Sequence, residues 1–325
     1  MLLKAATGLL SPAGVQGRLS ILIFHRVLPF PDPARPLIPD VARFDAMLRW
    51  TKTCFNVLPL EEAVGRLSSG TLPGRAACIT FDDGYADNYL HAWPVLKKHG
   101  LHATFFISTG FLDGGIMWND ALGLTVRRSA LAAIDCSKLG LGVHALGTPG
   151  ERATALRALN KAIKHLPYAE RSRAVDLIAA QGGVELPTDL MLTSAQLREL
   201  RADGAGIGAH TITHPILAAC DDGLALREIV GGKRALESIL GEEVRLFAYP
   251  NGKPDTDYRR VHVDMVRGAG FIAAVTTAPG AACHGDDAFQ IPRYTPWRDR
   301  RFGFSAQLVR NLVDARRCAP VLASS

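Results

Sequence analysis

Residues 76–85 read Ala-Ala-Cys-Ile-Thr-Phe-Asp-Asp-Gly-Tyr. An apolar run that suits a buried strand leads directly into two carboxylates and a glycine, which predicts a strand ending in a sharp turn. In parallel α/β folds, reactive groups collect where strands end at their carboxyl side, because the loops there vary while the sheet stays rigid. Asp82 and Asp83 therefore have two interpretations: they form the turn and cap the next helix, or they carry chemistry.

The composition is that of a globular protein. The chain has 325 residues, of which 48% are hydrophobic, enough for one large α/β domain or for a domain with an insertion. Its net charge of +6 favours anionic surroundings such as acidic glycans or lipid headgroups. The basic residues are scattered and no nucleic-acid-binding motif is present, so we expect no nucleic-acid partner. Nothing in the composition indicates an oligomeric state.

The cysteines and the N-terminus indicate a compartment. The six cysteines lack the short spacing of metal motifs and are interpreted as free thiols in a reducing compartment. They are Cys54, Cys78, Cys136, Cys220, Cys283 and Cys318. Ser11, Pro12 and Gly14 interrupt the apolar start before a signal core develops, and no run reaches the roughly 18 to 20 apolar residues that span a bilayer. We expect a cytoplasmic protein, and association with the inner face of the membrane stays open.

Two further apolar runs predict strands on either side of the motif. Residues 19–24 read Leu-Ser-Ile-Leu-Ile-Phe and lead into His25, and residues 102–108 follow a helical pattern at 87–99. The motif strand, this helix and the next strand form a β-α-β unit, which implies parallel strands with a right-handed crossover. His25 is either a hydrogen-bonded core residue or a functional group at the end of the first strand.

A second motif lies later in the chain. Residues 205–215 read Ala-Gly-Ile-Gly-Ala-His-Thr-Ile-Thr-His-Pro. His210 and His214 can bind one metal ion if the chain between them makes a single turn, although two surface histidines at this interval are also common. Two neutral imidazoles and one carboxylate suit a divalent ion such as Zn²⁺ and leave a position open to water, as in catalytic sites. A second carboxylate can then take a proton from that water.

Together the two motifs resemble the polysaccharide deacetylases, the carbohydrate esterase family 4-like group that shares the NodB homology domain. The resemblance rests on 80–85 and 210–214 and covers roughly 19–295 apart from an insertion. It implies an α/β fold, a distorted (β/α)7 barrel, and a metal-dependent hydrolase that removes N-acetyl groups from an N-acetylated polysaccharide or sugar precursor. By this resemblance Asp82 is the general base. The metal ligands are then Asp83, His210 and His214.

A third motif departs from the family pattern. Residues 247–252 read Phe-Ala-Tyr-Pro-Asn-Gly, where many relatives have Phe-Arg-Pro-Pro-Tyr-Gly, so Ala248 replaces the arginine partner of the base. Arg293 is a candidate to supply that charge from a later strand end, and a structural ion pair is its alternative. By the same resemblance the substrate-binding residues are Tyr249, Pro250 and Asn251.

The acid is expected on the first strand. The family's late histidine has no clear counterpart after residue 284. Residues 24–27, Phe-His-Arg-Val, resemble the circularly permuted branch that includes deacetylases of biofilm poly-N-acetylglucosamine, in which this strand supplies the acid. The resemblance therefore makes His25 the expected acid that protonates the departing amine. Histidine suits this role because its charge changes near neutral pH.

The domain organisation follows from these motifs. Helical patterns at 151–165 and 169–181, without strand signals between them, indicate a helical insertion that acts as a lid or as a packing element. The expected boundaries are 1–18 for an N-terminal extension, 19–325 for the barrel, about 119–190 for the insertion and about 303–317 for a C-terminal helix.

Several alternatives remain open. We expect Zn²⁺, but two histidines and a carboxylate also hold Co²⁺, Ni²⁺ or Fe²⁺. The expected partner is a carbohydrate substrate, and the missing export signal favours a lipid-linked or nucleotide-linked precursor inside the cell. The rival functions are an amidase that acts on a small non-glycan C–N bond, and a catalytically inactive metal- or glycan-binding module, which Ala248 and Asn251 make plausible.

Overall fold

The computed structural model of the chain describes residues 2–296, 298 and 300–314. The chain forms two compact units. The first comprises Met1–Leu112 and Leu192–Ser325, and the second comprises Asp113–Met191. Within the described residues, no helix combines the length and the apolarity that crossing a membrane requires.

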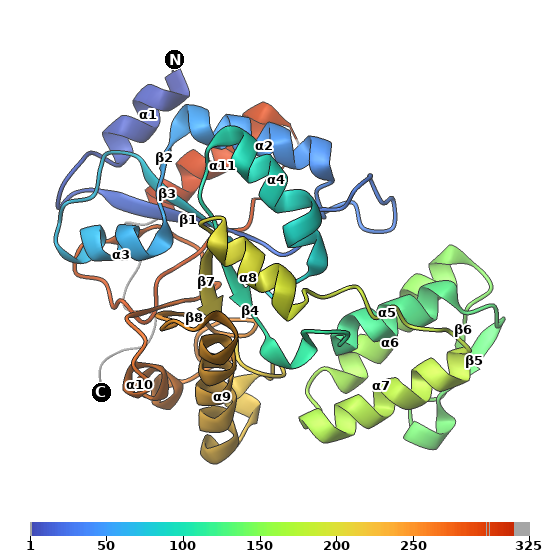
Figure 1. Ribbon diagram of the computed structural model, residues 1–325. Coiled ribbons are helices and arrows are strands. Elements are labelled where there is room, and N and C mark those ends of the chain that lie inside the picture. Colours follow the sequence, from blue (N-terminus) through green and yellow to red (C-terminus); the bar gives the residue numbers. More distant parts are fainter. Residues whose placement is uncertain (1, 297, 299, 315–325) are drawn as a thin grey trace. The chain divides into compact units, whose positions relative to one another are not determined.

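The first unit is built on a parallel-rich sheet (Figure 1). Over the described residues the sheet has eight strands in the order β10-β1-β3-β4-β7-β8-β9, with β2 paired to β3. All of these pairings are parallel except that between β1 and β10. The strands are β1 (Arg18–Phe24), β2 (Asn56–Val57), β3 (Ala76–Phe81), β4 (Thr104–Ile107), β7 (Gly206–Ala209), β8 (Leu246–Ala248), β9 (Ala273–Val275) and β10 (Ala282–Cys283).

An extended segment at 291–294 closes the curled sheet. Ile291 forms a parallel bridge with Val275 of β9, and Tyr294 forms one with Leu22 of β1. Backbone hydrogen bonds of 2.8 to 3.0 Å accompany both bridges. The segment thus connects β9 to β1 and closes a ring that also contains β3, β4, β7 and β8. The resulting distorted α/β barrel is the fold that the sequence predicts.

Helices connect the strands of the first unit and cover them. They are α1 (Leu2–Leu10), α2 (Val41–Cys54), α3 (Leu60–Ser68), α4 (Trp93–His99), α8 (Ser194–Ala202), α9 (Asp222–Leu240), α10 (Arg260–Gly268) and α11 (Arg301–Asp314), with the π-helix η1 (Asn88–Ala92) and the 3₁₀ turns η2 (Thr109–Phe111) and η4 (Leu217–Ala219). Helix α8 begins with a capping box, in which Thr193 and Gln196 satisfy each other's backbone N–H groups. The predicted C-terminal helix is α11, and positions 315–317 of that prediction lie outside the described residues.

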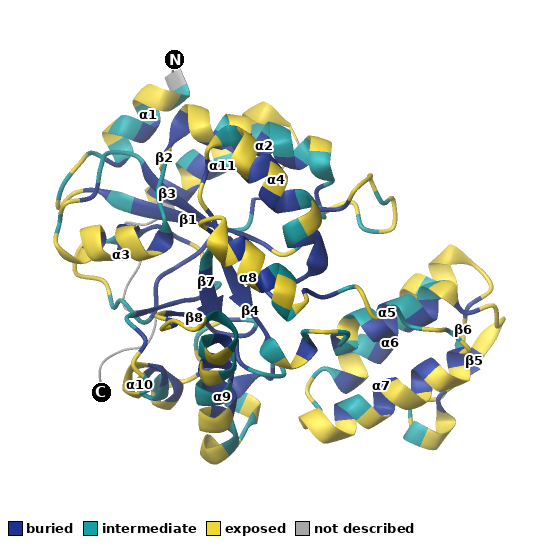
Figure 2. Ribbon diagram, in the orientation of Figure 1, coloured by how far each residue is buried: buried dark blue, intermediate teal, exposed yellow. Residues whose placement is uncertain are grey.

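The barrel strands are buried on both faces, which explains their unbroken apolar sequences. Ile79 and Phe105 belong to one hydrophobic cluster, whereas their neighbours Cys78 and Phe106 belong to another. Figure 2 shows these strands as a buried layer among helices whose outer faces are exposed. The five cysteines that the structure describes are free thiols, and Cys318 lies outside the described residues.

The second unit is helical and has its own core. Its elements are α5 (Trp118–Arg128), β5 (Ala133–Asp135), η3 (Ser137–Leu139), β6 (Val143–Ala145), α6 (Pro149–Ile163) and α7 (Tyr168–Gly182). Leu122, Leu159 and Ile178 are fully buried in this core. The antiparallel pair β5–β6 precedes the two predicted helical patterns and adds two short strands to the predicted helical insertion. Each of these strands has three residues, too few for a visible alternation of apolar and polar positions.

Candidate metal centre

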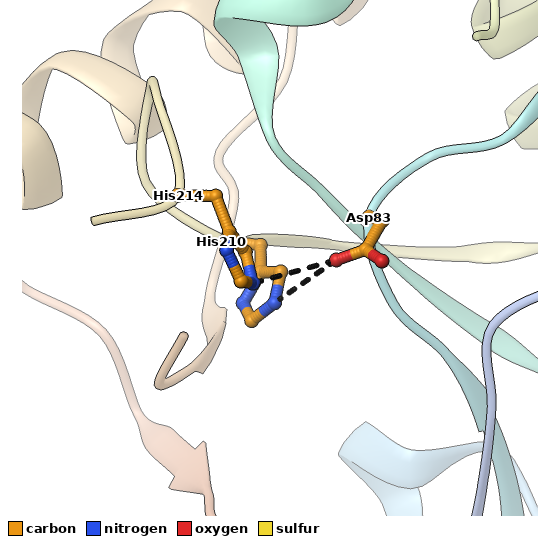
Figure 3. Close-up of side chains that lie close together, drawn as sticks. All are labelled: Asp83, His210 and His214. Atoms are coloured by element: carbon orange, nitrogen blue, oxygen red, sulfur yellow. Dashed lines mark ion pairs between the residues drawn. The ribbon is translucent and has the colours of Figure 1, made fainter. Parts of the chain in front are cut away.

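Three side chains from two strand ends converge at one edge of the sheet. Asp83 follows β3, and His210 and His214 follow β7. Their possible ligand atoms all lie within 4.8 Å of one another, and Figure 3 shows both imidazoles facing the carboxylate. Nε2 of His210 lies 3.6 Å and Nε2 of His214 lies 3.5 Å from Oδ1 of Asp83. The two motifs that the sequence separates by more than a hundred positions therefore meet at one point.

The histidine loop has the single turn that a shared ion requires. Thr211 and His214 have φ angles of 66° and 53°, and the backbone N–H of His214 donates to Oγ1 of Thr211 over 3.1 Å. Asp83 also has a positive φ, of 78°. Residues other than glycine rarely adopt this left-handed conformation, and β-branched residues such as threonine adopt it most rarely. Such strain persists only where the surroundings enforce it, and it is concentrated at functional sites.

A backbone carbonyl fixes the orientation of His210. Nδ1 of His210 lies 2.7 Å from the carbonyl oxygen of Ala248, at the end of β8. Because a carbonyl only accepts, we infer that Nδ1 carries the proton and that Nε2 presents its lone pair toward Asp83. The third motif therefore contributes to the site through its backbone, at the position where many relatives have arginine.

The donor set fits a divalent transition metal. Two imidazole nitrogens and one carboxylate oxygen are ligands that Zn²⁺ accepts, and three protein ligands are typical of catalytic zinc sites. The ring of His210 is buried, whereas 14% of the His214 side chain is exposed. His210 thus lies in the protein interior, and the cluster is accessible to solvent at His214.

Asp82 lies beside this cluster and is held by Arg293. Nη1 and Nη2 of Arg293 donate to the two oxygens of Asp82 over 2.7 and 2.6 Å. Arg293 also donates to the carbonyl of Thr276 and to Oγ1 of Thr80, so its guanidinium is fixed in place. Oδ2 of Asp82 lies 3.9 Å from Nε2 of His210. The charge that Ala248 does not supply is present here from the segment that closes the barrel.

The charges around Asp82 keep it ionised. Burial alone raises the pKa of this carboxyl, but the positive charge of Arg293, the neighbouring imidazoles of His210 and His25, and the hydrogen bonds from Arg293 outweigh burial and lower the pKa to about 2. A carboxylate at this position is therefore negatively charged throughout the neutral range.

His25 is exposed at the end of β1, in the same mouth of the barrel. A positive charge on His25 would contribute to the lowered pKa of Asp82. The side-chain amide of Asn88, in η1, donates to the backbone carbonyl of His25 over 2.8 Å. The structure thus gives His25 a fixed backbone and an accessible ring, and it excludes the interpretation of a buried core histidine.

The side chain of Asp87 binds Arg26 and Val27, the two residues that follow His25. Its carboxylate accepts from Nε of Arg26 over 2.7 Å and from the backbone N–H of Val27 over 3.2 Å. Burial raises the pKa of Asp87, although the charge of Arg26 opposes that effect. Sequence reasoning missed Asp87 and Asn88. Their position directly after the Asp-Asp-Gly-Tyr motif, in the first turn of the following helix, was the available signal.

The structure corrects the expectation that Tyr249, in the third motif, contacts the substrate. The side chain of Tyr249 is fully buried and stacks on Tyr258 at 4.0 Å, and its hydroxyl donates to the carbonyl of Phe289 over 3.1 Å. No part of this side chain is left to touch a substrate, because it completes the core beneath the strand end. Pro250 is also buried, whereas Asn251 is half-buried, with a φ of 56° at the same edge of the sheet as the histidines.

Comparison with known proteins agrees with this arrangement. The family model described as polysaccharide deacetylase matches residues 69–146 and 151–266. YxkH of Bacillus subtilis (strain 168), provisionally named a polysaccharide deacetylase, is 22% identical over 278 residues, which are 85% of this chain and 70% of that protein. A poly-β-1,6-N-acetyl-D-glucosamine N-deacetylase of Staphylococcus aureus is 36% identical over 70 residues, 21% of this chain and 24% of that protein.

Two solved structures are similar in fold. IcaB from Ammonifex degensii superposes with a TM-score of 0.60 at 21% identity, covering 92% of this chain and 98% of that chain. The deacetylase PplD of Streptococcus pyogenes, solved in complex with acetate, gives a TM-score of 0.58 at 20% identity and covers 92% and 97%. At these identities the likeness concerns the fold.

Proposed function

This chain belongs to the polysaccharide deacetylase family, and on that premise we propose that it is a metal-dependent hydrolase that removes N-acetyl groups from an N-acetylated polysaccharide or sugar precursor. One observation carries the proposal: the possible ligand atoms of Asp83, His210 and His214 lie within 4.8 Å of one another, beside a carboxylate that Arg293 holds. The named activity of the Staphylococcus aureus relative supports an N-acetylglucosamine polymer as the substrate class.

Asp83, His210 and His214 would hold the ion. A divalent ion held there would supply Lewis-acid chemistry, which favours attack of water on the acetamide carbonyl. The donor set supports Zn²⁺ first and also allows Co²⁺, Ni²⁺ or Fe²⁺.

Two side chains move protons in the proposed reaction. Asp82 accepts a proton from the attacking water, and Arg293 keeps both carboxylate oxygens oriented while it does so. His25 then donates a proton to the amide nitrogen as the C–N bond breaks, so that the products are acetate and a free amine. Without this proton the nitrogen would have to leave as a strongly basic amine anion, so the protonation is necessary for turnover.

The polymer would lie along the edge where the strands end. His25 follows β1 and is exposed, and Pro250 and Asn251 follow β8. We assign Asn251 to substrate contact, since its half-buried side chain is accessible from this edge, and we give Pro250 the supporting role of shaping the turn.

Acetate release tests the proposal. Purified protein is incubated with N-acetylated glucosamine oligomers, with nucleotide-linked N-acetyl sugars and with small amides, each with Zn²⁺ or with a chelator. We expect metal-dependent acetate release from an acetylated sugar. Turnover of the small amides alone would indicate an amidase instead. Metal binding without acetate release from any substrate would indicate a binding module.

A further inference from the structure

Glu228 is a buried carboxylate that the proposed reaction does not use. It lies in α9, and only 6% of its surface is exposed. Its two oxygens accept three hydrogen bonds, all from the loop that carries the histidines. Oε2 accepts from the backbone N–H groups of Ile212 and Thr213 over 2.9 and 2.8 Å. Oε1 accepts from the hydroxyl of Thr213 over 2.7 Å.

These bonds hold the part of the loop between the two histidines. A backbone N–H that is partly shielded from water and has no acceptor is destabilising, so the loop depends on Glu228 for its conformation. Thr211, the residue before Ile212, has the left-handed φ of 66°. A strained turn of this kind persists only where its surroundings hold it in place. The two oxygens of the Glu228 carboxylate provide such support to this loop.

Glycines allow α9 and a neighbouring turn to approach this loop closely. A Cβ atom on Gly232 would lie 2.8 Å from the carbonyl carbon of Thr211, and one on Gly231 would lie 2.5 Å from Cδ1 of Ile212. On the other side, the N–H of Gly110 donates to the carbonyl of Ile212 over 2.8 Å. The loop is therefore held by contacts with α9 on one side and with Gly110 on the other. Glu228 is the charged residue among these contacts.

We propose that Glu228 is a positioning residue that sets the affinity of Asp83, His210 and His214 for a divalent ion. It fixes the peptide groups of Ile212 and Thr213, and so it fixes the direction in which His214 leaves the turn and faces Asp83. The inference rests on the metal site of the proposed function. Groups outside the ligand set that orient metal ligands typically contribute ~10- to 100-fold to affinity.

Zinc titration against a chromophoric chelator tests this role directly, without a substrate. We expect Glu228→Ala to weaken Zn²⁺ binding by ~10- to 100-fold. Glu228→Gln should stay within a few-fold of the unchanged protein, because its carbonyl can accept both backbone N–H groups and its amide can donate to Thr213. Arg227→Ala, an exposed truncation at the neighbouring position of the same helix, is the matched control and should leave the affinity unchanged.

A second readout separates positioning from general stability. Co²⁺ bound to the unchanged protein gives a visible absorption spectrum that reports the ligand geometry, and we expect Glu228→Ala to alter this spectrum while Glu228→Gln preserves it. Gly232→Ala disturbs the same loop from the helix side and should also weaken Zn²⁺ binding, with Glu228 intact.

The outcomes are distinguishable. Normal affinity and a normal Co²⁺ spectrum in Glu228→Ala would overturn the inference and leave the proposed hydrolase intact. Equal losses in the Gln and Ala variants would also overturn it, since the hydrogen bonds would not explain the effect. If the unchanged protein bound no divalent ion at all, both this inference and the proposed function would fail.

Discussion

Arg293 forms a two-pronged ion pair with Asp82, from which it is separated by 211 positions in the sequence. Both side chains are buried, and the two N–O distances are 2.7 and 2.6 Å. The pair occurs because the segment at 291–294 closes the barrel beside β1, next to β3, whose end carries Asp82. The charged partner of Asp82 thus comes from this closing segment, whereas position 248 in the third motif holds an alanine.

Removing Arg293 should destabilise the protein and reduce turnover. Arg293→Leu leaves a buried carboxylate without its charge partner, and we expect a loss of ~3 to 5 kcal/mol in the free energy of unfolding. Denaturant unfolding measures this loss. Arg267→Leu removes a half-exposed ion pair with Asp287 and should cost less than ~1 kcal/mol. Equal effects of the two substitutions would contradict the structural importance of the buried pair.

Asp82→Asn should separate proton transfer from metal binding. The amide cannot accept a proton from water, so we expect acetate release to fall by at least ~10²- to 10⁴-fold, the usual contribution of a positioned base. Because Asp82 is not among the three clustered ligand residues, Zn²⁺ binding should persist. Activity and zinc content are measured on the same preparation. A variant that retains most of its hydrolytic rate would remove Asp82 from the role of base.

His214→Ala should lower the affinity for the metal itself. The substitution removes one of the three converging donors, and its cost should exceed the ~10- to 100-fold typical of groups outside the ligand set. Competition with a chelator measures the change. The control is His102→Ala, an exposed histidine that precedes β4. If both variants bound Zn²⁺ like the unchanged protein, His214 would not be a ligand.

Asn88→Ala should impair the step assigned to His25. The lost hydrogen bond holds the backbone of His25, so we expect kcat to fall by roughly tenfold, equivalent to ~1.4 kcal/mol, with unchanged zinc affinity. Steady-state kinetics and zinc titration check the two parts. Tyr89→Phe removes a neighbouring hydroxyl that points to Glu199 and is the control. Loss of zinc binding in Asn88→Ala would instead indicate a general disturbance of the site.

The free energy of unfolding should fall on acidification, because His262 binds a proton more readily in the unfolded chain. This residue is 2% exposed, and its Nδ1 accepts from the backbone N–H of Arg259 over 2.9 Å. Burial lowers its pKa below the usual value of 6.5; the charge of Asp222 opposes this effect and the charge of Arg259 adds to it. The unfolded chain therefore binds the proton more readily, so stability is complete above about pH 6.5 and decreases below it, by at most ~1.4 kcal/mol per pH unit.

His262→Gln provides the comparison for this pH effect. Its side-chain carbonyl can accept the same N–H, as glutamine does in a capping box, but it does not titrate. Denaturant unfolding between pH 7.5 and 5 should show a shallower pH dependence for the variant. Identical slopes would mean that His262 does not contribute to the acid sensitivity.

The local patterns of the sequence predicted parallel strands, a pair of carboxylates and a pair of histidines, and the resemblance to the polysaccharide deacetylases implied the barrel and the ligand role of Asp83. The run at 76–85 predicts a strand that ends in carboxylates, and β3 ends at Phe81, directly before Asp82. Because parallel strands present their carboxyl ends at one edge, the histidines after β7 could be expected near Asp83. Each of these features depends on residues that are close in sequence or on the regular geometry of a parallel sheet.

Contacts between segments that are far apart in the sequence were decided by the tertiary structure alone. Whether Arg293 reaches Asp82 depends on how the barrel closes, and the burial of Tyr249 depends on Tyr258 and Phe289 packing around it. The support that Glu228 gives to the histidine loop depends on the close approach of α9. Side-chain direction and burial arise from packing between elements, and neither periodicity nor motif spacing records them.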